Sequence, residues 1–314
     1  MPRTISHDGD DATETVAVVI PTLNEERSIG KVLDSVPVAD LLKNGFETAV
    51  YVIDGRSTDT TREIAVEKGA MIILEERKGK GLAVQTAFKA ITADYAIMVD
   101  GDDTYPIELA AEMIRLLQTH DVVIGSRLKG TIEPGAMSRL NVLGNTLLTL
   151  LARALFSITV TDVCTGLWGY RGDAIRRLEL EAPGFEIEAD MFGECARKRL
   201  RIAEIPIRYR ARVDHAKLSS LRDGLRIGAF LCRKRLVART RTPAANAQPV
   251  NAGTRDGQRV ALVQRWDVPN RQQKLIRRPE QTTRSPTHWS EGDSSDPGHV
   301  EVNLETQEMV LACQ

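Results

Sequence analysis

The feature that most constrains the fold of this chain is a regular alternation of short apolar segments with stretches of helical spacing. Five apolar segments follow one another: Val16–Ile20, Ala49–Ile53, Met71–Leu74, Tyr95–Val99 and Val122–Ile124. Between them lie four stretches of helical character: Glu25–Val36, Thr60–Lys68, Leu82–Ile91 and Pro106–Gln118. This alternation predicts an α/β fold, a mostly parallel sheet with helices on both faces. Because ligands of such sheets bind beyond the carboxyl ends of the strands, the candidate site lies among the residues that follow each strand.

The composition changes near residue 240. The stretch 240–314 lacks sustained apolar periodicity and holds eight of the ten glutamines. Such a segment buries too little apolar surface to offset the entropy of ordering. We expect one folded domain over residues 16–239, and little order in residues 1–15 and 240–314.

Charge and cysteine content exclude several classes of protein. The net charge of −1 gives no overall field that would recruit nucleic acid. The four cysteines, at positions 164, 195, 232 and 313, lie far apart, which fits a reducing compartment rather than a zinc site or disulfide framework.

Residues 1–15 are polar and acidic, unlike a signal peptide. The charge-free stretch Leu140–Ala152 is shorter than the roughly 20 residues of a membrane span, so no transmembrane helix is expected.

The sharpest candidate for chemistry is the acidic run after Tyr95–Val99, which contains Asp100, Asp102 and Asp103. Carboxylates this close together repel one another unless a cation is present. Carboxylate and phosphate oxygens are the usual ligands of Mg²⁺ and Mn²⁺. A solvated acidic turn before the helix at Pro106 is the alternative, but polar motifs at other strand ends favour the metal site.

Those other motifs are Pro21–Glu26, Asp54–Asp59, Lys78–Gly81 and Gly125–Arg127. Taken singly, each is explained as well by a tight turn or a helix cap. The GxGxxG, Walker A and GxSxG motifs are absent, which disfavours dinucleotide-binding, P-loop and serine-hydrolase functions.

In combination the motifs resemble a known family. The sequences VVIPTLNE at 18–25, VIDGRSTD at 52–59 and VDGD at 99–102 resemble the inverting GT-A glycosyltransferases of family 2. The resemblance covers roughly residues 15–236 and is nearest to the dolichol-phosphate mannosyltransferase-like group, in particular the archaeal dolichyl-phosphate hexosyltransferases of N-glycosylation. The segments 161–170, 184–190 and 216–224 support this branch.

The resemblance implies roles for individual residues. Nucleotide-sugar contacts fall to Pro21, Leu23, Glu25, Val52, Asp54, Lys80, Gly101, Thr104 and Arg139. The metal ligands are Asp100 and Asp102, which with Arg127 form the catalytic set. The cations expected to hold the lipid phosphate are Arg127, Arg139, Arg212 and Lys217.

The resemblance also implies an activity: transfer of glucose, N-acetylglucosamine or mannose from a nucleotide sugar to polyprenyl (dolichyl) phosphate, with Mg²⁺ or Mn²⁺ as cofactor. Two departures bear on the donor. Thr104 stands where mannosyl enzymes usually have Gln, and IDGR at 53–56 replaces DDGS. UDP-hexoses are therefore at least as well supported as GDP-mannose.

Alternatives remain open. A phosphate acceptor is already ionised, whereas a soluble or polymeric hydroxyl acceptor would need a general base, for which Asp162, Glu186 and Glu188 are candidates. The intact Asp100, Asp102 and Arg127 argue against a non-enzymatic sugar-nucleotide sensor.

A lipid acceptor requires contact with a membrane. The segments near 141–158 and 221–236 combine apolar helical spacing with basic residues, which is typical of interfacial helices. Ordinary core helices with a basic outer face are the alternative. We expect a peripheral protein on the cytoplasmic face of the cell membrane.

Overall fold

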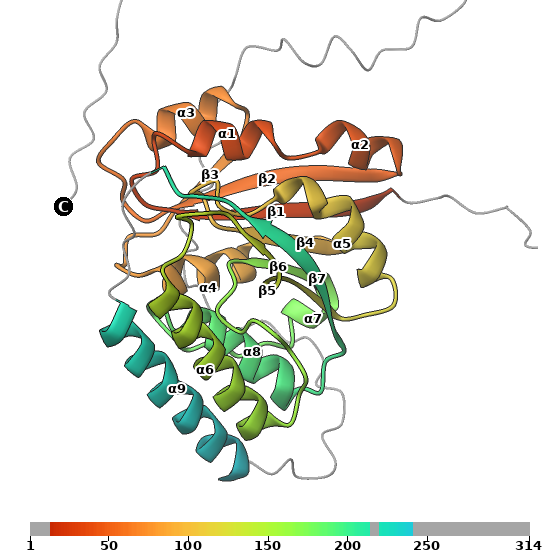
Figure 1. Ribbon diagram of the computed structural model, residues 1–314. Coiled ribbons are helices and arrows are strands. Elements are labelled where there is room, and N and C mark those ends of the chain that lie inside the picture. The colour runs from red at the N-terminus through yellow and green to blue at the C-terminus, as the bar shows by residue number, and fades with distance from the viewer. Residues whose placement is uncertain (1–12, 214–219, 241–314) are drawn as a thin grey trace, which may run out of the picture. The chain divides into compact units, whose positions relative to one another are not determined.

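The computed structural model describes residues 13–213 and 220–240, all within the first of two compact units, Met1–Val268. The prediction of low order for residues 1–12 and 241–314 falls on positions outside the described residues. The described part is a seven-stranded sheet with a layer of helices on each face, as Figure 1 shows. This confirms the predicted α/β class with a mostly parallel sheet.

The sheet has the strand order β3-β2-β1-β4-β6-β5-β7. Its strands are β1 Glu14–Thr22, β2 Phe46–Asp54, β3 Met71–Leu74, β4 Tyr95–Val99, β5 Val122–Ile132, β6 Leu167–Arg171 and β7 Ile202–Tyr209. All neighbouring strands are parallel except β6, which runs antiparallel to both β4 and β5. The carboxyl ends of β1, β2, β4 and β5 therefore open onto one edge.

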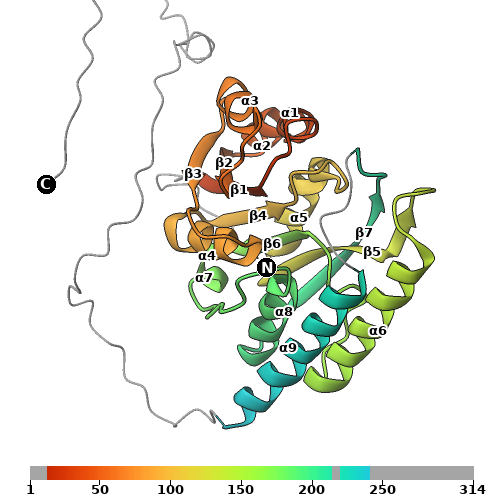
Figure 2. The same cartoon turned by 90° about the vertical axis from the view of Figure 1, so that its left-hand side faces the viewer.

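Two layers of helices cover the sheet (Figures 1 and 2). One face carries α1 Ile29–Asp34, α2 Val38–Lys43, α3 Thr61–Glu67 and α5 Ala110–Leu117, the last preceded by the 3₁₀ turn Ile107–Leu109. The other carries α4 Lys80–Ala90, α6 Arg139–Phe156, α8 Ile187–Arg197 and α9 Ser220–Thr240. A short helix, α7 Gly172–Ile175, follows β6. Alternate residues of the central strands supply the two cores: Val18 and Ile97 face one layer, whereas Val19 and Met98 face the other.

The second half of the sheet and the N-terminal boundary differ from the expectations. Strands β6 and β7 were not predicted; Trp168 and Tyr170 of β6 are fully buried in the core. Residues 14 and 15, assigned to a loose N-terminus, begin β1 instead. The Thr15 amide donates to the Asp94 carboxylate at 2.8 Å, which ties this end of β1 to the residue before β4.

Helix α9 packs beside α6 and α8 on the lower face of the sheet in Figure 1. Its residues Ile227, Phe230 and Leu231 belong to the core beneath that face. The expectation that the whole apolar side of 221–236 contacts a membrane is therefore wrong for these three residues, because the protein interior already covers them. Among the described helices, none is both long enough and apolar enough to cross a bilayer.

Candidate functional site

The ends of β1, β2 and β4 meet at the predicted edge of the sheet. The Ser28 hydroxyl bonds to the carbonyl oxygen of Gly101 at 2.8 Å and to the carboxylate of Glu25 at 3.0 Å. The amide of Gly55 donates to the carbonyl of Thr22 at 2.8 Å. These bonds link the loops that follow three separate strands, so residues 73 positions apart along the chain form one surface.

Each carboxylate of the acidic run after β4 has a cationic partner. The Nζ of Lys80 lies 2.6 Å from Oδ1 of Asp100. The guanidinium of Arg212 reaches Oδ2 of Asp102, with Nε at 2.7 Å. These two ion pairs offset the repulsion that the sequence predicts between the carboxylates of Asp100 and Asp102.

The third carboxylate of the run, Asp103, points to a different set of partners. It bonds to Lys31 of α1 and to Arg210, whose Nη1 lies 3.2 Å from Oδ1. Asp103 adopts a left-handed backbone conformation, with φ of 60°, which turns it away from the extended path of β4. Its role is to join α1 to the segment after β7.

Lys80 also pairs with a second carboxylate, since its Nζ lies 2.5 Å from Oε1 of Glu188 at the start of α8. Burial lowers the pKa of Lys80, but the charges of Asp100 and Glu188 outweigh that effect and hold its pKa above the usual value. Lys80 is therefore a permanent cation beside Asp100.

The orientation of the two candidate metal ligands is defined by their neighbours. Oδ1 of Asp102 accepts hydrogen bonds from the amide of Thr104 at 3.1 Å and from its hydroxyl at 2.6 Å. The Asp100 carboxylate lies so close to Gly166 that a Cβ atom there would overlap its Oδ2. Thr104 is fully buried, so its side chain contributes to the site by orienting Asp102.

Within the described ranges, no group of three or more His, Cys, Asp and Glu side chains is arranged to hold a metal ion. Asp100 and Asp102 nevertheless fit a divalent cation such as Mg²⁺ or Mn²⁺, which is commonly bound by one or two carboxylates together with substrate phosphates. The donor set is all oxygen, as these hard cations prefer.

Arg127 is placed differently from the sequence-based expectation. It is buried, and its guanidinium bonds to Asp162 at 2.7 and 2.8 Å and to the carbonyl of Cys164 at 2.7 Å. Its Cζ also lies 5.4 Å from the ring centre of Tyr209. Because the guanidinium of Arg127 contacts protein groups, it holds the segment 162–164 against β5 and β7.

The predicted nucleotide-sugar contacts are brought together only in part. Pro21, Leu23 and Glu25 follow one another at the end of β1, and Leu23 is partly exposed there. Asp54 is fully buried and accepts hydrogen bonds from the amides of Arg56 and Ser57 at 3.1 and 3.0 Å, which shape its own loop. Val52 is part of the core, so its assignment to the nucleotide pocket does not fit the side chain's position.

Of the remaining cations, Arg139 is exposed at the first position of α6, and Lys217 lies outside the described residues. Two cations were missed: Lys31 and Arg210, which neutralise Asp103. No signal in the sequence distinguishes them from ordinary surface charges. The three described cysteines, Cys164, Cys195 and Cys232, are free thiols.

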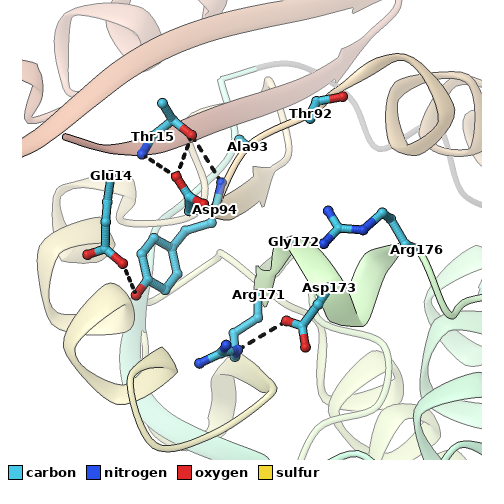
Figure 3. A pocket seen from close by; sticks show the side chains of 10 residues that line it. Glu14, Thr15, Thr92, Ala93, Asp94, Arg171, Gly172, Asp173 and Arg176 are labelled. Atoms are coloured by element: carbon cyan, nitrogen blue, oxygen red, sulfur yellow. Dashed lines mark hydrogen bonds and ion pairs between the residues drawn. The ribbon is translucent and has the colours of Figure 1, made fainter. Parts of the chain in front are cut away.

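A separate cavity of about 650 Å³ lies at the opposite end of the strands, lined by residues around the start of β1, the start of β4 and the end of β6 (Figure 3). Its polar groups bond to one another: Thr15 to Asp94, and Arg171 to Asp173 at 3.1 Å. None of the predicted site residues lines it. We therefore place the candidate site at the carboxyl ends of the strands.

Comparison with known proteins identifies a family and a fold. Residues 17–179 match the model of the family described as glycosyl transferase family 2. The chain is 35% identical over 238 residues to the low-salt glycan biosynthesis hexosyltransferase Agl6 of Haloferax volcanii, covering 72% of this chain but only 57% of that protein. It is 36% identical over 230 residues to a dolichyl-phosphate hexose transferase of the same organism, covering 73% of this chain and 97% of that protein.

The fold is similar to that of a solved enzyme. The crystal structure of glucosyl-3-phosphoglycerate synthase from Mycobacterium tuberculosis with phosphoglyceric acid superposes with a TM-score of 0.56 at 25% identity, covering 72% of this chain and 80% of that chain. The same synthase has been crystallised with Mn²⁺ and uridine diphosphate, at 24% identity.

Proposed function

Because the chain belongs to glycosyl transferase family 2, we propose that it transfers a hexose from a nucleotide sugar to a polyprenyl phosphate such as dolichyl phosphate, with inversion at the sugar. The observation that carries this proposal is the pair Asp100 and Asp102 at the carboxyl end of β4, with Lys80 and Arg212 beside them. The similarity to a dolichyl-phosphate hexose transferase supports the choice of acceptor.

The donor half of the reaction separates charge. The bond between C1 of the sugar and the diphosphate breaks, and the nucleoside diphosphate leaves with the electron pair. A divalent cation held by Asp100 and Asp102, Mg²⁺ or Mn²⁺, would supply Lewis-acid stabilisation of that leaving group. Lys80 and Arg212 place two further positive charges beside Asp100 and Asp102, where they would stabilise the negative charge that develops on the diphosphate.

The acceptor half is better served by a phosphate than by a hydroxyl. Each of the three carboxylates that could act as a general base has a cationic partner: Asp162 with Arg127, Glu186 with Arg226 at 2.7 Å, and Glu188 with Lys80. In each of these ion pairs a carboxylate oxygen is already engaged by a cation, which competes with acceptance of a proton from a hydroxyl. A phosphate monoester is already an anion, so its oxygen attacks C1 without losing a proton to the protein.

The surface of α6 supports a membrane-bound acceptor. Four of its leucines are more than half exposed and recur at helical spacing on one face: Leu140, Leu143, Leu147 and Leu150. Arg139 and Arg153 are exposed at the two ends of this row. The neighbouring helix α9 adds Leu225 and Leu236, exposed by 76% and 64%. An apolar row with basic residues at its ends is typical of helices that lie in a membrane interface.

The exposed apolar surface differs in part from the membrane surface expected from the sequence. Lys234, one of the basic residues of the segment 221–236, is buried and paired with Asp190 at 2.5 Å. We propose attachment through α6 and the exposed positions of α9, at the cytoplasmic face of the cell membrane where nucleotide sugars are available. A role in protein N-glycosylation belongs to the same proposal, with glucose, N-acetylglucosamine or mannose as the sugar transferred.

The test is transfer from radiolabelled UDP-glucose, UDP-N-acetylglucosamine and GDP-mannose to dolichyl phosphate in detergent, with Mn²⁺ or Mg²⁺. We expect one donor to give a lipid-linked sugar, and Asp102→Asn to reduce the rate at least a hundredfold. Asp103→Asn is the matched control, because Asp103 pairs with Lys31 and Arg210 and should retain most activity. Transfer to a soluble sugar acceptor but never to lipid phosphate would refute the proposed acceptor.

A further inference from the structure

A buried lysine of α9, Lys234, is not among the residues of the candidate site, yet it lies in a network that leads there. Its Nζ lies 2.5 Å from Oδ1 of Asp190 and 2.9 Å from Oε1 of Glu194, both on α8. The exposed fractions of the Asp190 and Glu194 side chains are 0% and 2%. Two buried carboxylates this close to each other need cations: Lys234 pairs with both, and Arg197 adds a second cation at 2.7 Å from Oε2 of Glu194.

The other oxygens of these carboxylates hold the backbone that precedes α8. Oδ2 of Asp190 accepts from the amides of Glu181 and Ala182 at 2.6 and 2.8 Å. Oε2 of Glu194 accepts from the amide of Glu179 at 3.0 Å. The segment 179–183 is thus fixed by two carboxylates: Asp190, which Lys234 balances, and Glu194, which Lys234 and Arg197 balance together.

This segment in turn holds the first turn of α4. The carbonyl of Pro183 accepts from the amide of Leu82 at 3.3 Å, and the carbonyl of Ala182 accepts from the side chain of Gln85 at 2.8 Å. The backbones are in close contact, since a Cβ atom at Gly81 would overlap the Ala182 carbonyl oxygen. Lys80 is the first residue of the helix fixed in this way.

We infer that Lys234 is a positioning residue for the donor site: through Asp190, Glu194 and the segment 179–183 it fixes the first turn of α4 and so holds Lys80 against Asp100. The inference rests on the proposed function, in which Lys80 faces the donor diphosphate. It also gives α9, which contributes exposed leucines to the proposed membrane surface, a physical connection to the metal ligands.

The inference predicts opposite effects on two ligands. Loosening Lys80 removes a competing cation from Asp100, so Mn²⁺ alone should bind several-fold more tightly. It also removes a positive charge from the diphosphate site, so UDP or GDP in the presence of saturating Mn²⁺ should bind at least fivefold more weakly. A general loss of structure would weaken both.

The experiment measures Mn²⁺ binding by electron paramagnetic resonance and nucleotide binding by calorimetry, for Lys234→Met, Lys80→Met and the double variant. We expect both single variants to shift the two affinities in opposite directions. The double variant should match Lys80→Met, because Lys234 acts through Lys80. Lys234→Arg should restore wild-type values, and Arg233→Met, an exposed neighbour on α9, is the control.

Gln85→Ala provides a milder perturbation of the same route if Lys234→Met does not fold, since it removes only the bond to the Ala182 carbonyl. It should shift both affinities in the same directions by a smaller factor. Additive effects in the double variant, or weaker binding of both ligands, would overturn the inference. Wild-type protein that binds Mn²⁺ but neither nucleotide would instead refute the proposed function, and the Mn²⁺ arm would still decide the role of Lys234.

Discussion

Replacing the exposed leucines of α6 should release the protein from membranes without unfolding it. Leu143, Leu147 and Leu150 are exposed by 55%, 57% and 51%. Full burial of a leucine side chain contributes about 1.5–3 kcal/mol, so a half-exposed leucine can gain about 1 kcal/mol on entering a bilayer interface. The triple change to Gln should therefore cost roughly 3 kcal/mol, which weakens binding to vesicles roughly 150-fold. Gln is chosen because it has nearly the helix propensity of Leu.

The assay is co-sedimentation with vesicles that contain anionic lipid, combined with thermal unfolding and with transfer to long-chain and short-chain prenyl phosphates. We expect an unchanged melting temperature, loss of sedimentation, and a selective loss of transfer to the long-chain acceptor. The control is Val38→Gln with Leu42→Gln, which changes two exposed apolar residues of α2 on the other layer. Equal sedimentation of wild type and triple variant would refute the assignment of α6 to the membrane. By contrast, Phe230 and Leu231 of α9 are core residues, and changing them tests folding instead.

Two further predictions concern single positions near the strand ends. Gly166→Ala should displace the Asp100 carboxylate and lower Mn²⁺ affinity about tenfold with a small change in melting temperature, because the added Cβ overlaps Oδ2; unchanged Mn²⁺ binding would show that Asp100 is not a metal ligand. The hydrogen bond from Arg77, against the opposing effect of burial, lowers the pKa of Glu75 to about 2 from a usual value of 4.5. The ion pair between Glu75 and Arg77 therefore stabilises the folded state fully above pH 4.5, and this stabilisation is lost as the pH falls toward 2. Its size is on the order of 1 kcal/mol, because Arg77 is largely exposed to solvent. Denaturant unfolding should show Glu75→Gln less stable than wild type at pH 7 and equal to it at pH 2; a constant difference would contradict this.

The sequence alone was sufficient for the first half of the sheet and for the carboxylates of the site. Residues Met71–Leu74 and Tyr95–Val99 were predicted with the boundaries that β3 and β4 have in the structure. Buried parallel strands are continuous apolar runs, and that signal is local. The position of Asp100 and Asp102 follows from it, because residues after such a strand emerge at the edge where ligands bind.

The tertiary structure decided which charges meet at that edge and which helices are buried. Arg212 lies 110 positions from Asp102, and Lys80 lies 108 positions from Glu188, so no local pattern could pair them. Strand β6 enters between β4 and β5 with reversed direction, a choice made by pairing between distant segments. Periodicity shows that α6 and α9 have apolar faces, but only packing decides whether protein or solvent covers each leucine. That is why Leu231 is core and Leu147 is surface, although both recur with other apolar residues at helical spacing.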